Sequence, residues 1–197
     1  MVLKLAARGV AIGVALAACA STTKLTNVLV VPETPRAKFR KVLVVGIVKN
    51  QATRQAYEAA MVKALQGAGV QAAPSQLLLP IGAAPTREAV ERLVAERGFD
   101  AAVVGRLVDS RTQVQEVPPT GAGFYGFYGW AAPIAYSPGY LETTRTVVVE
   151  TRAFRTAGDG AAVFSATSES VDPSSVSDAS QSISKLVVEE LRKNGFV

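Results

Sequence analysis

The pattern of apolar positions first predicts buried strands. Val42–Val48, with the sequence VLVVGIV, and Ala101–Val108, with the sequence AAVVGRLV, are apolar runs without alternation. Such runs are typical of strands that are covered on both faces of a sheet. A shorter strand is expected at Val70–Ala73, and the apolar residues Leu77–Leu79 that follow it should be buried. Three such strands, separated by helical segments, indicate a parallel arrangement.

Two helices are expected between these strands. Thr53 is positioned to cap the first helix, and Gly67 and Gly69 should end it. The second helix is expected to be capped by Thr86 and terminated by Gly98. The inward positions at helical spacing are Tyr57, Ala60, Met61, Ala64 and Leu65 in the first helix, and Val90, Leu93 and Val94 in the second.

The second half of the chain changes to an antiparallel pattern. Thr143–Arg155 and Ala161–Ser170 are strand segments joined by the glycine-containing turn 157–160, which predicts a hairpin. A final helix is expected after Asp172, with cations and Gly195 at its end. The hairpin is expected to direct Val147, Val149, Phe164 and Ala166 to the core, and the helix Val176, Ala179, Ile183, Val187 and Leu191.

Together these elements predict one α/β (α+β) domain over residues 41–197. Its mixed sheet should have about five strands, parallel in the first half and antiparallel in the C-terminal hairpin, with three helices. The preceding segment Ala20–Lys38 mixes small, polar and proline residues and is expected to be a tether. Within it, Val28–Val31 is apolar enough to dock as an edge strand.

The amino terminus carries the pattern of an export signal. Lys4 and Arg8 precede an apolar run of about ten residues, which is too short to span a bilayer as a helix. The run ends in LAAC, residues 16–19, which resembles the lipobox of bacterial lipoproteins. We therefore expect residues 1–18 to be cleaved, Cys19 to carry the lipid, and residues 19–40 to form the lipidated cysteine and tether. The alternative is a buried free cysteine in an ordinary secreted protein.

Composition excludes several classes of function. Cys19 is the only cysteine, so a chain lipidated there has no disulfide. The absence of histidine removes the usual general base, the usual metal ligand and any Ser-His-Asp arrangement. Loss of Lys4 and Arg8 lowers the net charge from +5 to +3, and no run of five basic residues suggests nucleic-acid binding. We expect no enzyme activity, no metal, no cofactor and no nucleic-acid partner.

An unusual segment precedes the hairpin. Residues 117–140, termed here the aromatic segment, read VPPTGAGFYGFYGWAAPIAYSPGY and hold seven of the thirteen aromatic residues of the chain. Tyrosine and tryptophan suit contacts with proteins, sugars or lipid head groups. Two alternatives remain open, namely that the segment folds back over the sheet or that it is disordered. The candidate partner-binding residues are Phe124, Tyr125, Phe127, Tyr128, Trp130, Tyr136 and Tyr140.

These features resemble a broad group of small Gram-negative outer-membrane lipoproteins, most of them uncharacterised. The resemblance rests on the lipobox, the VLVVGIV and AAVVGRLVD strands, and the TTRTVVVETRAF hairpin before a terminal helix. The layout is similar to the curli-secretion lipoprotein, the lipoprotein activators of penicillin-binding proteins and the amino-terminal domain of TolB. The resemblance implies a non-catalytic binding or assembly module.

The position after the lipidated cysteine informs localisation. Ala20 follows Cys19, where aspartate would be the usual signal for retention in the inner membrane, so we expect a palmitate-bearing anchor in the cell outer membrane, at its periplasmic face. The expected partners are this membrane and another envelope protein or cell-wall component. The alternative function is a self-assembling structural lipoprotein whose aromatic segment contacts its own copies or the membrane.

Overall fold

The computed structural model describes residues 22–32, 37–80, 82–116, 141–157 and 160–197. In chain order, the described elements are β1 (Thr22–Val30), β2 (Lys41–Ile47), α1 (Gln51–Gly67), β3 (Gln71–Pro74), the 3-10 turn η1 (Ser75–Leu77), α2 (Arg87–Arg97), β4 (Ala101–Glu116), β5 (Leu141–Arg155), β6 (Ala162–Val171) and α4 (Val176–Lys193). The six strands form one sheet in the order β1-β6-β5-β4-β2-β3. β2 pairs in parallel with β3 and β4, and the other neighbours are antiparallel. The predicted α/β class is confirmed, with one strand more than expected.

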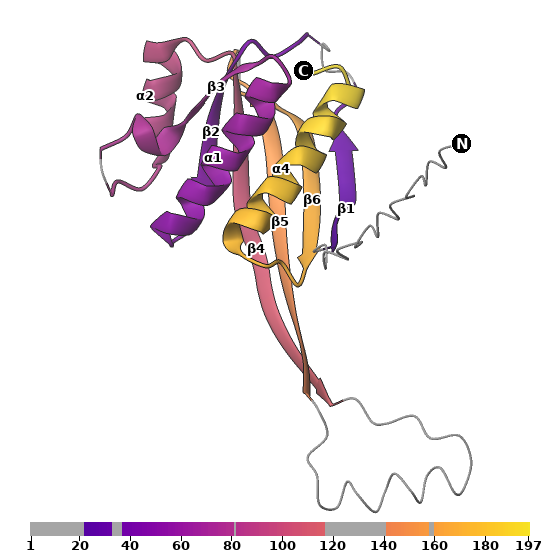
Figure 1. Cartoon of the computed structure of the whole chain (residues 1–197). Coiled ribbons are helices and arrows are strands. Elements are labelled where there is room, and N and C mark those ends of the chain that lie inside the picture. Colours follow the sequence, from indigo (N-terminus) through magenta and orange to yellow (C-terminus); the bar gives the residue numbers. More distant parts are fainter. Residues whose placement is uncertain (1–21, 33–36, 81, 117–140, 158–159) are drawn as a thin grey trace, which may run out of the picture.

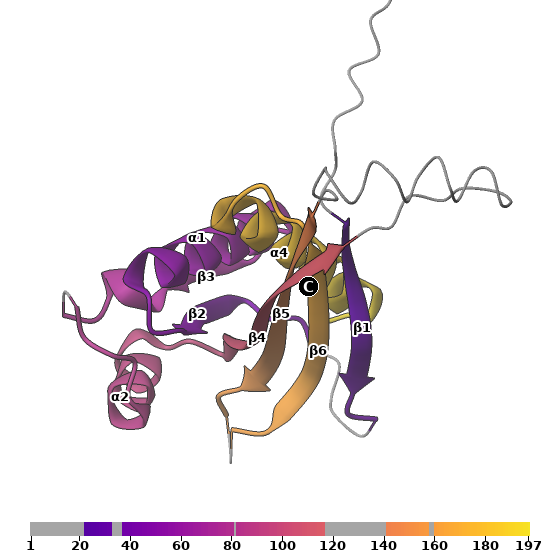
Figure 2. The ribbon, with the colours of Figure 1, turned by 90° about the horizontal axis from the view of Figure 1, so that it is seen from below.

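Helices cover both faces of the sheet. α1 and α4 lie side by side on one face, and α2 lies on the other face, as Figures 1 and 2 show. The larger core lies between α1, α4 and the sheet and includes Val42, Met61 and Leu191. A smaller core under α2 includes Leu43 and Leu93. Because β2 contributes alternate residues to both cores, its apolar run shows no alternation, as predicted.

The ends of two helices test the predicted caps. Thr86 Oγ1 accepts a hydrogen bond from the N–H of Ala89 at 3.3 Å, and Gly98 adopts a left-handed conformation with φ 64°, so both predicted ends of α2 are confirmed. α1 is capped by Asn50 instead of Thr53. The Asn50 side chain accepts a hydrogen bond from the N–H of Thr53 at 3.0 Å, and α1 therefore begins earlier than predicted.

Much of the segment that was expected to be a tether is a strand. β1 pairs antiparallel with β6 along the edge of the sheet, from Thr22 opposite Val171 to Val30 opposite Phe164, with a register shift after Leu25. Leu25 and Val30 pack against the larger core. Polar residues fill most of the other positions, so the strand has little local signal, and its pairing with β6 decides its conformation. The edge strand expected at Val28–Val31 is therefore confirmed as far as Val30, but it begins six residues earlier, at Thr22.

One of the leucines expected to be buried is exposed. Leu77 in η1 is 77% exposed, whereas Leu78 and Leu79 pack against the smaller core. The cause is the neighbouring Ser75, which is fully buried and donates a hydrogen bond from Oγ to Glu58 Oε1 at 2.8 Å. Because Ser75 faces the interior, the tight turn directs Leu77 to solvent.

Candidate functional site

The hairpin of β4 and β5 extends well beyond the body of the domain. Its strands pair as far as Glu116 and Leu141, whereas β6 ends at Val171, five residue pairs short of that point. Among the described strands, only β4 and β5 continue there, over residues 112–116 and 141–145. This two-stranded ribbon, termed the stem, is about 17 Å long at roughly 3.4 Å per residue. Figure 1 shows it projecting from the domain.

The stem holds both ends of the aromatic segment. All seven candidate partner-binding residues lie in that segment, outside the described residues, and so does Cys19. The sequence predicted that β4 ends at Val108 and that β5 begins at Thr143, so the ribbon is longer than expected. Residues 109–116 read DSRTQVQE, and such a polar stretch gives no strand signal on its own. Its extended form follows from pairing with β5.

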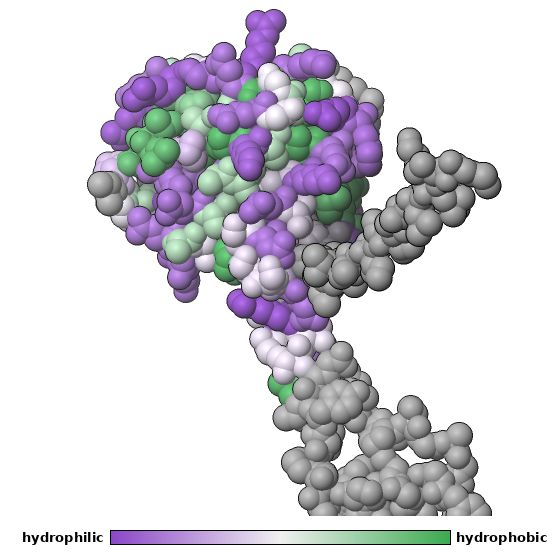
Figure 3. Space-filling model, in the orientation of Figure 1, coloured by the Kyte–Doolittle hydropathy of each residue, from purple (hydrophilic) through white to green (hydrophobic). Residues whose placement is uncertain are grey.

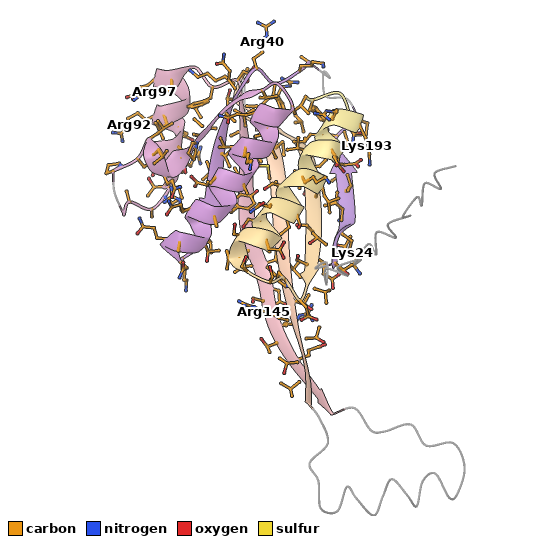
Figure 4. All side chains as sticks on the ribbon, in the orientation of Figure 1. Lys24, Arg40, Arg92, Arg97, Arg145 and Lys193 are labelled. Carbon is orange, nitrogen blue, oxygen red and sulfur yellow. The ribbon has the colours of Figure 1, made fainter. Side chains whose placement is uncertain are left out.

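β1 begins at the same end of the sheet from which the stem projects. Thr22 pairs with Val171, and Val171 pairs on its other side with Thr146, the β5 residue next to the stem. These three residues form one row across the sheet. Figure 4 shows Lys24 and Arg145 near this end of the domain. The start of β1 and the base of the stem are thus neighbouring features of one end of the molecule.

An apolar cavity of about 140 Å³ opens at this end. It lies between the first turns of α1 and α4, and strands β2, β4 and β5 form its floor. Leu107 and Val176 at its mouth are each 40% exposed, although helical spacing placed Val176 on the inward face. The apolar side chains of its walls are those of Val48, Tyr57, Val147, Val149, Ala179 and Ile183.

Tyr57 forms a closely packed wall of this cavity. Its ring lies over Gly105, and its hydroxyl is 3.2 Å from Thr151 Oγ1. Desolvation by burial raises the pKa of the Tyr57 hydroxyl above its ordinary value, and the nearby Glu58 adds to this effect, whereas the hydrogen bond with Thr151 opposes it. Tyr57 is therefore protonated and neutral at physiological pH.

Arg145 is the one charged residue among those that line the cavity. It precedes Val147 by two positions on β5, so both side chains lie on the helix-covered face. The Arg145 side chain is exposed, and within the described part of the chain its guanidinium has no hydrogen-bond or ion-pair partner. α1 and α4 also begin here, and helix N-termini carry partial positive charge. The mouth of the cavity is therefore apolar, with one cation, Arg145, at its rim.

A buried ion pair near the cavity is not predicted by the sequence pattern. Glu58 is fully buried, and its Oε1 accepts hydrogen bonds from Gly46 N–H and Arg54 Nε at 2.9 Å and from Ser75 Oγ at 2.8 Å. Its Oε2 accepts from Gln76 N–H at 2.9 Å. Every partner belongs to the framework of the fold, so the pair joins α1, β2 and η1. The sequence feature that could have indicated this pair is the four-residue spacing of Arg54 and Glu58, which lie beside the apolar face of a predicted helix.

The sheet face opposite α1 and α4 carries a second ionic group. Glu150 Oε2 lies 2.6 Å from Arg106 Nη2, and Glu150 Oε1 lies 2.6 Å from Arg152 Nη2. Hydrogen bonds from these two guanidinium groups hold the pKa of the Glu150 carboxyl below its usual range, Arg106 having the larger effect. Both arginines are more than half exposed, so this network is a solvated face of the sheet.

The described residues offer little basis for metal binding or for a membrane span. They hold no group of three or more His, Cys, Asp or Glu side chains placed to bind a metal ion. No helix among them is both long enough and apolar enough to cross a membrane. Figure 3 shows that hydrophilic and neutral residues cover much of the helix-bearing face and the stem below it. The cavity with Arg145 and the stem are therefore the features that mark this end of the molecule.

Comparison with known proteins identifies similar folds. No protein-family model matches the chain, and no curated protein matches it. A PelC dodecamer from Paraburkholderia phytofirmans is similar at 15% identity and a TM-score of 0.48, covering 86% of this chain and 97% of that one. The lipoprotein GNA1162 from Neisseria meningitidis is similar at 16% identity and a TM-score of 0.43, covering 78% and 99%. The likeness concerns the α/β fold alone, and the specific families that the sequence resembles are not shown by it.

Proposed function

We propose that this protein is an outer-membrane-anchored periplasmic lipoprotein that acts as a non-catalytic binding or assembly module for another envelope component. The observation that supports the proposal is the stem. It holds both ends of the aromatic segment about 17 Å beyond the body of the domain, at roughly 3.4 Å per residue. The side chains that the structure describes in this ribbon, residues 112–114 and 143–145, belong to neither core, which is consistent with a role in binding a partner.

The proposed anchor lies close to the stem. Cys19 precedes Thr22 by three positions, and an extended chain spans at most about 3.6 Å per residue, so a lipid on Cys19 is attached within about 11 Å of Thr22. Thr22 lies in the row of residues from which the stem departs. An anchored domain therefore presents this end to the membrane, and the partner is expected to be a component at the membrane surface.

A second candidate function is self-assembly, which the edge strand β1 favours. An unpaired strand edge is a template for pairing with another chain. Near the end of β1, Leu29 is 60% exposed, and Val28 and Val31 are each 38% exposed. In this reading, copies of the protein associate along β1 or through the aromatic segment. Concentration-dependent oligomers of a soluble form would favour it, and a monomer that captures a different protein would favour the first proposal.

In-cell photo-crosslinking tests the proposed contact surface. A photo-reactive amino acid is placed at Tyr128, at Val114 on the stem, or at Leu77, which is exposed but lies in η1. We expect a discrete protein or glycan adduct at Tyr128, a weaker one at Val114 and none at Leu77, identified by mass spectrometry. Adducts confined to lipid or to copies of this chain would support the second candidate instead.

Cell fractionation tests the anchor. Cys19→Ser is expected to abolish incorporation of an alkyne-labelled palmitate and to release the protein from the outer-membrane fraction. Cys19 is the only cysteine, so a diacylglyceryl group held by a thioether, or a palmitoyl group held by a thioester, must be attached there. Unchanged membrane association and labelling in Cys19→Ser would contradict the proposed lipid anchor.

A further inference from the structure

We propose that the apolar cavity binds a short segment of an acyl chain of an anionic lipid, with the lipid head group at Arg145. The inference rests on the proposed function in one respect, since the lipid on Cys19 is what brings this end of the domain beside a bilayer. Its other supports are the size, lining and charge of the cavity. The ligand is a phospholipid of the supporting membrane.

The size and lining of the cavity fit a short apolar group. Its volume is about 140 Å³, and an engineered protein cavity of about 150 Å³ lined by apolar side chains binds benzene, so about six carbons fit. Two of the hydroxyls in its walls are already bonded: that of Tyr57 pairs with Thr151, and that of Ser180 donates to the carbonyl oxygen of Val176 at 2.7 Å. Water would find few partners there, which favours an acyl segment.

The charge at the rim fits an anionic head group. The Arg145 guanidinium has no hydrogen-bond or ion-pair partner among the residues that the structure describes. The nearest acidic residues on neighbouring elements, Asp172 and Asp178, do not line the cavity. Asp172 accepts a hydrogen bond from the Arg145 backbone N–H at 2.6 Å, and Asp178 accepts one from Ser174 N–H at 3.1 Å. A phosphate at the mouth would therefore meet a cation without displacing a carboxylate.

Other occupants of the cavity fit this charge less well. The aromatic segment of the same chain, or of a second copy, has apolar rings of suitable size. Residues 117–140 contain no acidic residue, however, so either occupant would leave Arg145 without a counter-charge. An anionic lipid supplies both the apolar group and the charge, and we favour it for that reason.

A titration with short-chain lipids tests the proposal in the soluble mature chain, residues 19–197 with Cys19→Ser. The probe is dihexanoylphosphatidylglycerol, followed through the δ1-methyl NMR signals of Ile183, in the cavity wall, and Ile47, which is 50% exposed on the opposite sheet face. We expect a saturable shift of Ile183 and none of Ile47. From dibutyryl to dihexanoyl lipids, the affinity should rise about fourfold for each methylene added to the chain that occupies the cavity. The reason is that each bound methylene is transferred out of water.

Two variants separate the charge from the cavity. Arg145→Gln should weaken binding of dihexanoylphosphatidylglycerol at least about fivefold and bring it close to that of the net-neutral dihexanoylphosphatidylcholine. Arg111→Gln is the matched control, because Arg111 is paired with Asp109 and alternates to the other face of the ribbon. It should bind like the parent. Ala179→Leu should fill the cavity and abolish binding of both lipids, with its melting temperature measured in parallel.

Several results would overturn the proposal. One is the absence of an Ile183 shift with any lipid, and another is equal phosphatidylglycerol affinity in Arg145→Gln and the parent. A shift that appears only after deletion of residues 117–140, or only on dilution, would assign the cavity to the aromatic segment or to a second copy. Arg145 is exposed, so Arg145→Gln decides the matter even if Ala179→Leu does not fold. The soluble chain carries no lipid anchor, so a negative result in this titration would leave the proposed function intact. The proposed anchor is tested separately, by Cys19→Ser.

Discussion

The ring of Tyr57 lies so close to Gly105 that a Cβ atom added at position 105 would come within 2.1 Å of Tyr57 Cζ. Tyr57 is on α1 and Gly105 is on β4, so this contact sets how near the helix approaches the sheet. The side chain of Tyr57 is 6% exposed, and moving its ring into the neighbouring cavity would break the hydrogen bond between its hydroxyl and Thr151. Glycine at position 105 is therefore a packing requirement.

We expect Gly105→Ala to destabilise the domain by about 1–3 kcal/mol, because the added methyl group overpacks the interface between α1 and β4. Gly67→Ala is the matched control. A Cβ at position 67 meets nothing within 4 Å, and alanine favours a helix more than glycine does. Urea unfolding of both variants measures the difference, and equal stabilities would contradict the packing argument.

Stability should fall steeply at alkaline pH because of Tyr57. Burial raises the pKa of the folded Tyr57 hydroxyl above the unfolded value of about 10. Its contribution to stability is complete below pH 10 and is lost as pH rises, since the unfolded chain then releases a proton that the folded chain retains. Between pH 9 and 11.5, the parent should lose up to about 1.4 kcal/mol per pH unit more than Tyr57→Phe.

Tyr128→Phe is the control for this alkaline effect: if Tyr128 belongs to an exposed contact surface, as proposed, this variant keeps the pH slope of the parent. Near pH 7, Tyr57→Phe itself should cost about 1–3 kcal/mol, because Thr151 Oγ1 loses its partner in a buried site. Parallel pH slopes for the parent and Tyr57→Phe would show that the Tyr57 hydroxyl is not the group that titrates.

Glu58→Gln should be strongly destabilising, by about 3 kcal/mol or more, because it leaves the Arg54 guanidinium buried without its counter-charge. Glu91→Gln is the matched control, since Arg87 and Glu91 on α2 have the same four-residue spacing but are 84% and 61% exposed. It should have no measurable effect. Urea unfolding at neutral pH compares them, and a small effect at Glu58 would mean that the site admits water.

Replacement of Phe127, Tyr128 and Trp130 together by serine should leave folding nearly intact if these residues form a contact surface. The parent and the triple variant are compared by thermal unfolding of the soluble mature chain. A fall in melting temperature of more than about 8 °C, which corresponds to roughly 2 kcal/mol or more for a domain of this size, would show that the aromatic segment packs on the domain.

The sequence by itself determined the order and type of most elements. The unbroken run at β2, the Thr86 and Gly98 caps of α2, and the hairpin turn before β6 are all local patterns. Periodicity and capping act within a few residues of the chain, so they can be read without knowing what lies across the sheet. The α/β class, the mixed sheet and the three helices followed from these patterns.

The tertiary structure alone decided the features that shape the candidate site. The part of β1 before Val28 and the stem have weak local signals, and they are strands because Thr22 meets Val171 and Glu116 meets Leu141 across the sheet. The burial of Glu58 likewise depends on donors from β2 and η1, which lie 12 to 18 residues away in the chain. Strand pairing and the satisfaction of a buried charge are both set by non-local partners, and local sequence carries no direct record of which partners those are.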